Sequence, residues 1–252
     1  MSFTRYIVYR KIFILFVLFR LSICAYSQSA DDIINKYVEF IGGESQWKTI
    51  KTIVTNGQYN YGGMLFPVTT YSKAPDLYKF VVSLNGKYYA QAFDGKTGWK
   101  IDVFNGETAP TQLSGKAASA MANEANVELE DALINYKVKG YRASLEGKDS
   151  ANGKSCYKIK LLRKEGDVET YYIDDKTSEL VLKKTVAKNP ELGNAIIYIS
   201  YSDYRKINDI RIPFKSIVKT DDQTILTIGI IKAETNTPIE DSTFHWQKTP
   251  IN

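Results

Sequence analysis

The sequence predicts a mainly β protein with some α structure: a large antiparallel sheet of about 11–12 strands, curled into an unclosed barrel, with an N-terminal helix and an inserted helical lid. Three observations lead to this fold class. Apolar and polar residues alternate over most of the 252-residue chain. Asn-Gly and Asp-Gly pairs, which favour hairpin turns, separate the alternating segments. Two other segments carry apolar residues at helical spacing.

The N-terminus has the pattern of a secretory signal peptide. Arg5, Arg10 and Lys11 precede the apolar stretch Ile12–Phe19, which continues at Leu21–Cys24 after the interruption by Arg20. Small residues at positions 25 and 27 precede a cleavage point after Ser27. The apolar stretch is short for a membrane span. We therefore expect residues 1–27 to be removed on export and residues 28–252 to form one domain in the periplasm.

Two alternatives for this segment stay open. An uncleaved segment would anchor the chain in the membrane. Acylation of Cys24 would make the protein a membrane-anchored lipoprotein, although Ile23 is larger than the residue expected before a lipidated cysteine. If cleavage follows Ser27, Cys156 is the sole remaining cysteine and no intrachain disulfide can form.

The charge of the chain argues against a nucleic-acid partner. The formal net charge is +5, but residues 1–27 hold four basic residues and no acidic one. The exported chain would therefore be nearly neutral. Nucleic-acid binding needs a concentrated basic face, which this composition does not supply.

The first expected element after the signal is an amphipathic helix. Ser29 is a suitable N-cap, and Gly42-Gly43 is a suitable stop. Five apolar residues recur at helical spacing between them: Ile33, Ile34, Tyr37, Val38 and Ile41.

From about residue 50 the period changes to two. Alternating residues in Tyr78–Leu84 and Lys87–Phe93 flank Asn85-Gly86, and Asp94-Gly95 leads into the next alternation at Trp99–Val103. Closely spaced X-Gly turns of this kind predict an antiparallel meander.

Residues 112–136 interrupt the strands with one or two expected helices, rich in alanine and with apolar residues at helical spacing. We predict that this insert forms a lid, with Met121, Leu129 and Leu133 facing the sheet. Alternation resumes after Gly140 and continues to Ala233 without a Pro/Ser-rich linker.

A curled sheet of this size has a concave face that must be filled, covered or left as a ligand cavity. Alternation suggests a set of aromatic residues for the wall of such a cavity, and tyrosine suits a wall that is apolar but wet at its rim. Plain core packing remains the alternative for each of them. The predicted wall residues are Phe66, Tyr78, Phe80, Phe93, Trp99, Tyr172 and Tyr201.

The residues for chemistry are sparse. His245 is the only histidine, and no G-x-S-x-G elbow accompanies it. Cys156 lies in an alternating segment, as expected for a small buried residue. The acidic pairs Asp31-Asp32, Asp174-Asp175 and Asp221-Asp222 lie at a helix start or at turns, where aspartate is favoured for backbone hydrogen bonding. We therefore expect no catalytic residues, no metal, no cofactor and no enzyme activity.

Three motifs carry a family resemblance: Asp94–Trp99 in the meander, Tyr171–Asp174 after the helical insert, and Ser202–Arg205 leading to Ile212-Pro213-Phe214. Together with the opening helix they resemble the periplasmic lipoprotein-carrier superfamily, the LolA-like outer-membrane lipoprotein-sorting proteins, over residues 30–245. The resemblance implies an unclosed barrel whose aromatic-lined cavity receives the acyl chains of lipoproteins in transit.

Three functions follow as hypotheses. The leading one is an exported carrier or sensor of lipid, acyl or lipoprotein ligands, with the inner- and outer-membrane sorting machinery as further partners. The second is an envelope interaction or stress-sensing module with the same fold and no lipid cargo. The third is a hydrolase on the same scaffold, with His245 as its most testable residue.

Overall fold

The structure, a computed structural model, describes residues 28–128, 131–164, 166–187, 193–221 and 223–245. Three α-helices lie in these ranges: α2 (Ala30–Phe40), α3 (Glu44–Trp47) and α4 (Gly115–Glu128). Two 3₁₀ turns, Val103–Asn105 and Asp241–Thr243, complete the helical elements. The helix predicted after Ser29 is thus confirmed as α2.

The thirteen strands in these ranges all belong to one antiparallel sheet. This is slightly more than the predicted number of about 11–12 strands, and it includes the two-residue strand β6. In chain order the strands are β1 (Thr52–Tyr61), β2 (Met64–Lys73), β3 (Leu77–Leu84), β4 (Lys87–Asp94), β5 (Gly98–Asp102), β6 (Thr111–Gln112), β7 (Arg142–Ala151), β8 (Lys154–Leu162), β9 (Val168–Asp174), β10 (Leu180–Val186), β11 (Ile196–Ile207), β12 (Ile210–Lys219) and β13 (Thr224–Thr235).

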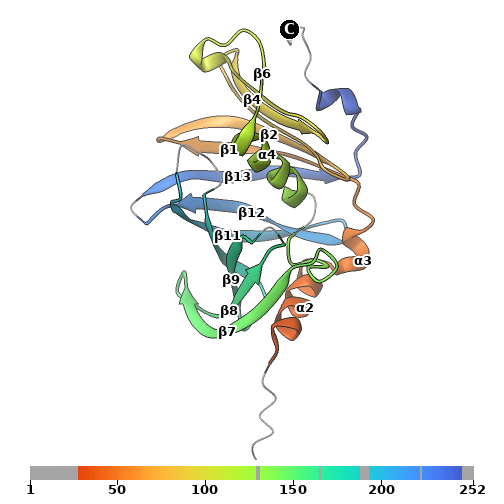
Figure 1. Cartoon of the computed structure of the whole chain (residues 1–252), viewed down its shortest axis with the longest axis vertical. Helices are drawn as coiled ribbons and strands as arrows, with labels where there is room; N and C mark the ends of the chain where they lie inside the picture. The colour runs from red at the N-terminus through yellow and green to blue at the C-terminus, as the bar shows by residue number, and fades with distance from the viewer. Residues whose placement is uncertain (1–27, 129–130, 165, 188–192, 222, 246–252) are drawn as a thin grey trace, which may run out of the picture.

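The sheet is built from two meanders that a single strand pairing joins. Its order is β6-β5-β4-β3-β2-β1-β13-β12-β11-β10-β9-β8-β7. Every pairing is between neighbours in sequence except β1 with β13. The edge strands β6 and β7 do not pair with each other, so the sheet is open, as predicted (Figure 1).

The β1–β13 junction is bulged. Asn56 pairs with Lys232 and Gly57 pairs with Ile230, which leaves Ile231 as the extra residue. A side-chain carbon at Gly57 would lie 2.2 Å from the carbonyl oxygen of Gly229, so only glycine fits this approach. Bulges increase the local twist and bend a sheet, and this one lies at its middle.

The sheet carries its α-helices on one face, here called the helix-bearing face. Ile53, Ser72, Tyr78 and Phe93 occupy one cross-strand row and therefore point to the same side. Ile53 packs in the cluster that contains α2, whereas Tyr78 and Phe93 pack against Met121 of α4. Figure 1 shows α2 beside β7 and β8, and α4 in front of the sheet; α4 contacts β3, β4 and β5.

At the α2 end the cover is well packed. Ser29 and Asp32 form a capping box that starts the helix. Ile33, Ile34 and Tyr37 are at most 3% exposed and join Trp47 and strands β8 and β9 in one hydrophobic cluster. Trp47 Nε1 donates to the carbonyl oxygen of Ile41 (3.1 Å), which fixes α3 against the end of α2.

The prediction of one or two inserted helices is confirmed by α4, and the described residues that follow it form no second helix. Residues 132–140 form turns, because the Asp131 carboxylate accepts hydrogen bonds from the backbone N–H of Leu133 (2.7 Å) and from the Tyr37 hydroxyl (2.7 Å). Such side-chain bonds compete with helix formation. Leu133 is buried in the α2 cluster, far along the sheet from Met121, so these two predicted lid residues cover different strands.

The opposite face has smaller clusters and a C-terminal strap, residues 236–245. Trp99 Nε1 donates to the carbonyl oxygen of Phe244 (2.8 Å), and Phe244 is fully buried. Lys79 Nζ donates to the carbonyl oxygen of Thr243 (3.0 Å), and Lys73 pairs with Asp241 (2.6 Å). The strap therefore covers β2–β5 on the side away from α4.

Candidate ligand-binding face

The middle of the helix-bearing face lacks the dense packing found at its ends. β13 is the central connecting strand, yet none of its twelve residues is buried. Leu226, Ile228 and Ile230 are partly exposed, and none belongs to a buried cluster. Partly exposed apolar residues in the middle of a sheet are typical of a surface that something else covers.

Cross-strand pairing places Leu226 and Ile228 in two continuous rows on this face. In the first, Leu226 lies between Val218 and Tyr61; in the second, Ile228 lies between Ser216 and Tyr59. The complete first row, across nine strands, is Leu145, Ile159, Tyr171, Lys183, Ile199, Val218, Leu226, Tyr61 and Met64. The second row is Tyr201, Ser216, Ile228, Tyr59 and Phe66.

Aromatic rings line the part of this face nearer α4. Tyr59 contacts Phe80 edge-on, with ring centroids 5.6 Å apart, and stacks on Tyr61 at 6.2 Å. Phe66 contacts Phe104 at 5.8 Å. These rings give the face an apolar surface that ends at the exposed β1–β2 turn, where Tyr61 is 54% exposed.

A charged cluster lies at the other side of the same face. Arg163 Nε is 3.0 Å from Glu169 Oε2, and the Tyr171 hydroxyl donates to the same oxygen (2.7 Å). The Arg163 and Glu169 side chains are only 10% and 7% exposed. Lys183 is opposite Tyr171 in the register, so its side chain is on this face beside the pair.

The protonation of this cluster follows from its charges. Burial opposes ionisation of Glu169, but Lys183 and Arg163 outweigh it and hold the pKa of the carboxyl below its ordinary value. Burial alone would lower the pKa of Lys183, whereas Tyr201, Glu169 and Asp131 hold it above its ordinary value. Both groups are therefore charged at neutral pH.

Five of the predicted wall residues lie on the helix-bearing face. Tyr78 and Phe93 are buried under α4, so they are packing residues of that cover. Phe66, Phe80 and Tyr201 are partly exposed and lie in or beside the two open rows. Of the predicted lid residues, Met121 and Leu133 are buried under different parts of the cover, and Leu129 lies outside the described residues.

Trp99 and Tyr172 lie on the opposite face, which corrects their assignment to the same wall. Gly98 pairs with Phe93 and therefore lies on the helix-bearing face. Trp99 is the next residue along the strand, so its side chain points to the opposite face. Tyr172 is likewise one residue out of phase with Tyr171, and it packs with Cys156 and Val181. The alternation of residues along a strand separates its two faces, but it does not show which face carries the helices.

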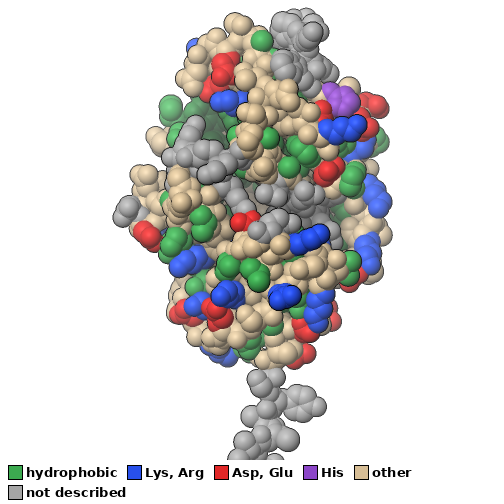
Figure 2. All heavy atoms as spheres, viewed as in Figure 1, with side chains coloured by type: hydrophobic (Ala, Val, Ile, Leu, Met, Phe, Trp, Pro, Cys, Tyr) green, Lys and Arg blue, Asp and Glu red, His purple; other side chains and the backbone are tan. Residues whose placement is uncertain are grey.

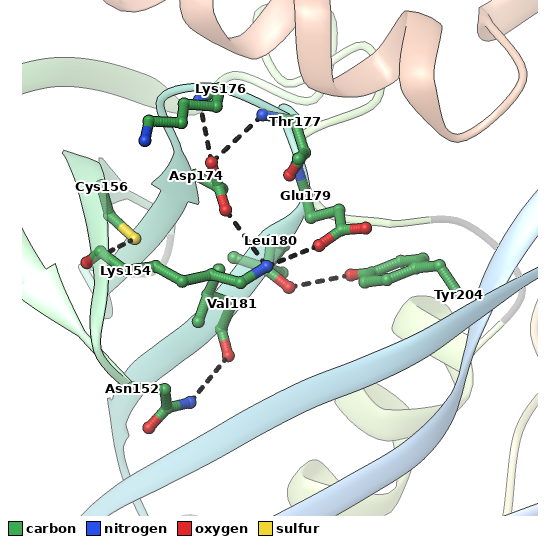
Figure 3. Close-up of polar contacts among 10 residues, drawn as sticks. All are labelled: Asn152, Lys154, Cys156, Asp174, Lys176, Thr177, Glu179, Leu180, Val181 and Tyr204. Atoms are coloured by element: carbon green, nitrogen blue, oxygen red, sulfur yellow. Dashed lines mark hydrogen bonds and ion pairs between the residues drawn. The ribbon is translucent and has the colours of Figure 1, made fainter.

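Figure 3 shows the contacts that give Asp174, the first residue of the acidic pair at 174–175, a structural role. Asp174 Oδ1 accepts from the backbone N–H groups of Lys176 (2.8 Å) and Thr177 (3.1 Å), as in an Asx turn. Lys154 Nζ bridges Asp174 (3.1 Å) and Glu179 (2.8 Å). Cys156, below this turn, is fully buried, and burial raises the pKa of its thiol, so the thiolate is disfavoured.

The part of the chain that the structure describes has few other residues suited to catalysis or metal binding. His245 is exposed at the end of the strap. Within the described ranges, no three His, Cys, Asp or Glu side chains gather closely enough to hold a metal ion. No α-helix in those ranges combines the length and apolarity needed to span a membrane. On the face shown in Figure 2, acidic and basic side chains are interspersed.

These features define an open, curled antiparallel sheet with helices on one face and a central strand, β13, whose residues are all at least partly exposed. No family model matches the sequence, and no curated protein matches it. Solved structures do share the fold. A DUF1329 family protein from Desulfovibrio piger aligns with 86% of this chain and 97% of its own, with a TM-score of 0.57 and 16% identity.

Two further structures carry names that bear on the class. A LolA superfamily protein from Nitrosomonas europaea covers 87% of this chain and 98% of its own, with a TM-score of 0.54 and 11% identity. A putative outer membrane lipoprotein-sorting protein domain from Vibrio parahaemolyticus covers 84% and 94%, with a TM-score of 0.53 and 11% identity. The chain therefore has the LolA-like open fold that the sequence motifs predicted.

Proposed function

We propose that this protein is an exported, non-enzymatic binding protein of the bacterial envelope that holds a lipid, acyl or lipoprotein ligand on the middle of its helix-bearing face. One observation carries the proposal: β13 is central in the sheet, rich in isoleucine and leucine, and free of buried residues. Its location rests on the signal-like pattern of residues 1–27.

The fold and the residues support this role in different ways. The names of two structures with this fold refer to the LolA superfamily and to lipoprotein sorting, which makes an acyl ligand the natural first candidate. An acyl chain gains about 0.8 kcal/mol for each methylene that it buries. A row such as Ile199, Val218 and Leu226 thus binds such a chain without any catalytic group.

Native mass spectrometry tests the proposal directly. The protein is purified from its own envelope fraction without detergent, and its native mass is compared with its denatured mass. We expect excess mass that disappears on denaturation and yields fatty acid, phospholipid or lipopeptide on extraction. A clean mass, together with no rise in melting temperature on adding lipids or lipopeptides, would leave the lipid-free interaction module as the better reading.

A matched pair of variants locates the ligand. Ile228→Asp places a charge in the second open row, and we expect it to abolish the bound mass. Ile231→Asp places the same charge on the extra residue of the bulge, which is 67% exposed, and we expect the bound mass to persist. Equal retention of ligand by both variants would place the ligand elsewhere.

A further inference from the structure

We propose that Lys183 anchors the anionic group, a carboxylate or a phosphate, of an amphiphilic ligand whose apolar chain lies along Ile199, Val218, Leu226 and Tyr61. The inference rests on the proposed function and adds to it the chemical class of the ligand's head group. It predicts a fixed direction for the ligand, with the charged end at β10 and the apolar end at the exposed β1–β2 turn.

The register provides the geometry. Lys183 is the only charged member of the nine-strand row, and apolar side chains follow it on each strand toward β1. Neighbouring strands are about 4.8 Å apart, so the four steps from β10 to β1 span roughly 19 Å. This distance is comparable to that of an extended palmitoyl chain.

The contacts of the neighbouring carboxylates explain why Lys183 is available. Glu169 Oε2 is already engaged by Arg163 and by the Tyr171 hydroxyl. Asp131 already accepts from the Tyr37 hydroxyl and from the backbone N–H of Leu133. Among the residues that the structure describes, none forms a hydrogen bond or an ion pair with Lys183 Nζ.

A lysine in an apolar row is costly unless its charge is compensated. The nearby carboxylates compensate it at a distance and keep the ammonium protonated. A lysine that served only as a structural counter-ion would be expected to contact Glu169, yet no such ion pair forms, although Arg163 makes one at 3.0 Å. A protonated ammonium with open donor positions suits a carboxylate or phosphate oxygen.

Binding of three amphiphiles with the same chain and different heads tests the anchor. Palmitate and hexadecyl phosphate carry an anionic head, and hexadecanol does not; each is titrated below its aggregation concentration by isothermal calorimetry. We expect the wild-type protein to bind either anion roughly ten- to hundredfold more tightly than hexadecanol. Preference for one anion over the other would identify a fatty acid or a phospholipid as the source of the head group.

The matched variants are Lys183→Met and Lys184→Met. Lys183→Met keeps an apolar stem, and we expect it to lose the preference for the anions while hexadecanol binds as before. Lys184 is the next residue, on the opposite face, with its Nζ 5.5 Å from the Tyr198 ring centroid, so Lys184→Met should bind like wild type. Lys183→Arg, which keeps the charge, should retain most of the preference.

The outcomes separate the anchor from the proposed function. Equal affinity of the wild-type protein for palmitate, hexadecyl phosphate and hexadecanol would overturn the anchor and leave a lipid-binding protein. No binding of any of the three would overturn both. The wild-type comparison needs no variant, so it decides the matter even if Lys183→Met fails to fold.

Discussion

The two regions of the helix-bearing face differ in how completely the chain covers them. Under α2, Ile33, Ile34 and Leu133 are at most 2% exposed. On β13, at the middle of the same sheet, Ile228 and Ile230 remain partly exposed although they are equally apolar. Composition therefore does not explain the difference, whereas the position of the helices does.

The comparison shows how a fold can have a well-packed core and still keep apolar residues partly exposed in the middle of its sheet. The cluster under α2 provides a dry core, and α4 covers the strands at the far end. The strands between them are held by the sheet hydrogen bonds on both sides rather than by a covering layer. Stability and binding are thus expected to depend on different residues.

The largest contrast should come from the same truncation in the two regions. Ile34→Ala removes a side chain that is 1% exposed and should lower the free energy of unfolding by about 3–4 kcal/mol. Ile228→Ala should cost less than about 1.5 kcal/mol, because its side chain is only partly buried. Urea unfolding of both variants makes the measurement, and equal losses would contradict the comparison.

A second, somewhat smaller effect on the free energy of unfolding concerns the charged cluster of Arg163, Glu169 and Lys183. Glu169→Gln removes the counter-ion of Arg163 and leaves its charge buried, so we expect a loss of about 2–3 kcal/mol at neutral pH. Because the pKa of Glu169 is held low in the folded state, its contribution is complete above the ordinary glutamate pKa of about 4.3. It is lost as the pH falls through the lower, folded-state value.

Unfolding free energies measured from neutral pH down to the acid transition check this dependence. The difference between wild type and Glu169→Gln should shrink toward zero as the pH falls through that window. Glu146→Gln is a suitable control, since Glu146 is paired with Lys158 at 3.5 Å on the partly exposed edge. A constant difference at every pH would mean that the Glu169 charge is not the cause.

The smallest effect tests whether the middle of the face is filled. Ser216 lies beside Ile228 and Tyr201 in the second open row. Ser216→Phe should change the free energy of unfolding by less than about 0.5 kcal/mol while reducing ligand binding, since Ser216 is partly exposed. In a filled core, the same substitution would cost about 1–3 kcal/mol through overpacking, and thermal unfolding distinguishes the two results.

Much of the fold was predictable because the signals were local. The cap at Ser29 and the stop at Gly42-Gly43 define α2, and the Asn-Gly and Asp-Gly turns define the first meander. The motifs at Asp94–Trp99 and Ser202–Arg205 led to the correct fold class. The pairing of β1 with β13 had no local signal, since it joins segments from opposite ends of the described chain.

The site was less predictable for reasons that lie in the sheet itself. Trp99 and Tyr172 were placed on the wrong face because the alternation of apolar and polar residues does not show which of the two faces carries the helices. Lys183 was not singled out, because a lysine in an alternating strand is normally a solvent-facing residue. Only the register, with its irregularity between Leu180 and Leu182, places it opposite Tyr171 on the helix-bearing face.

The late position of β13 also sets the order in which the molecule can assemble. Each meander needs only pairings between adjacent strands, which close short loops and form early. Joining the meanders brings together partners as distant as Thr52 and Thr237, which are 185 residues apart. Until that step, the edges of β1 and β13 are both unpaired, and unpaired edges recruit other chains. The pairing of β13 with β1 is therefore the step that removes both of these edges.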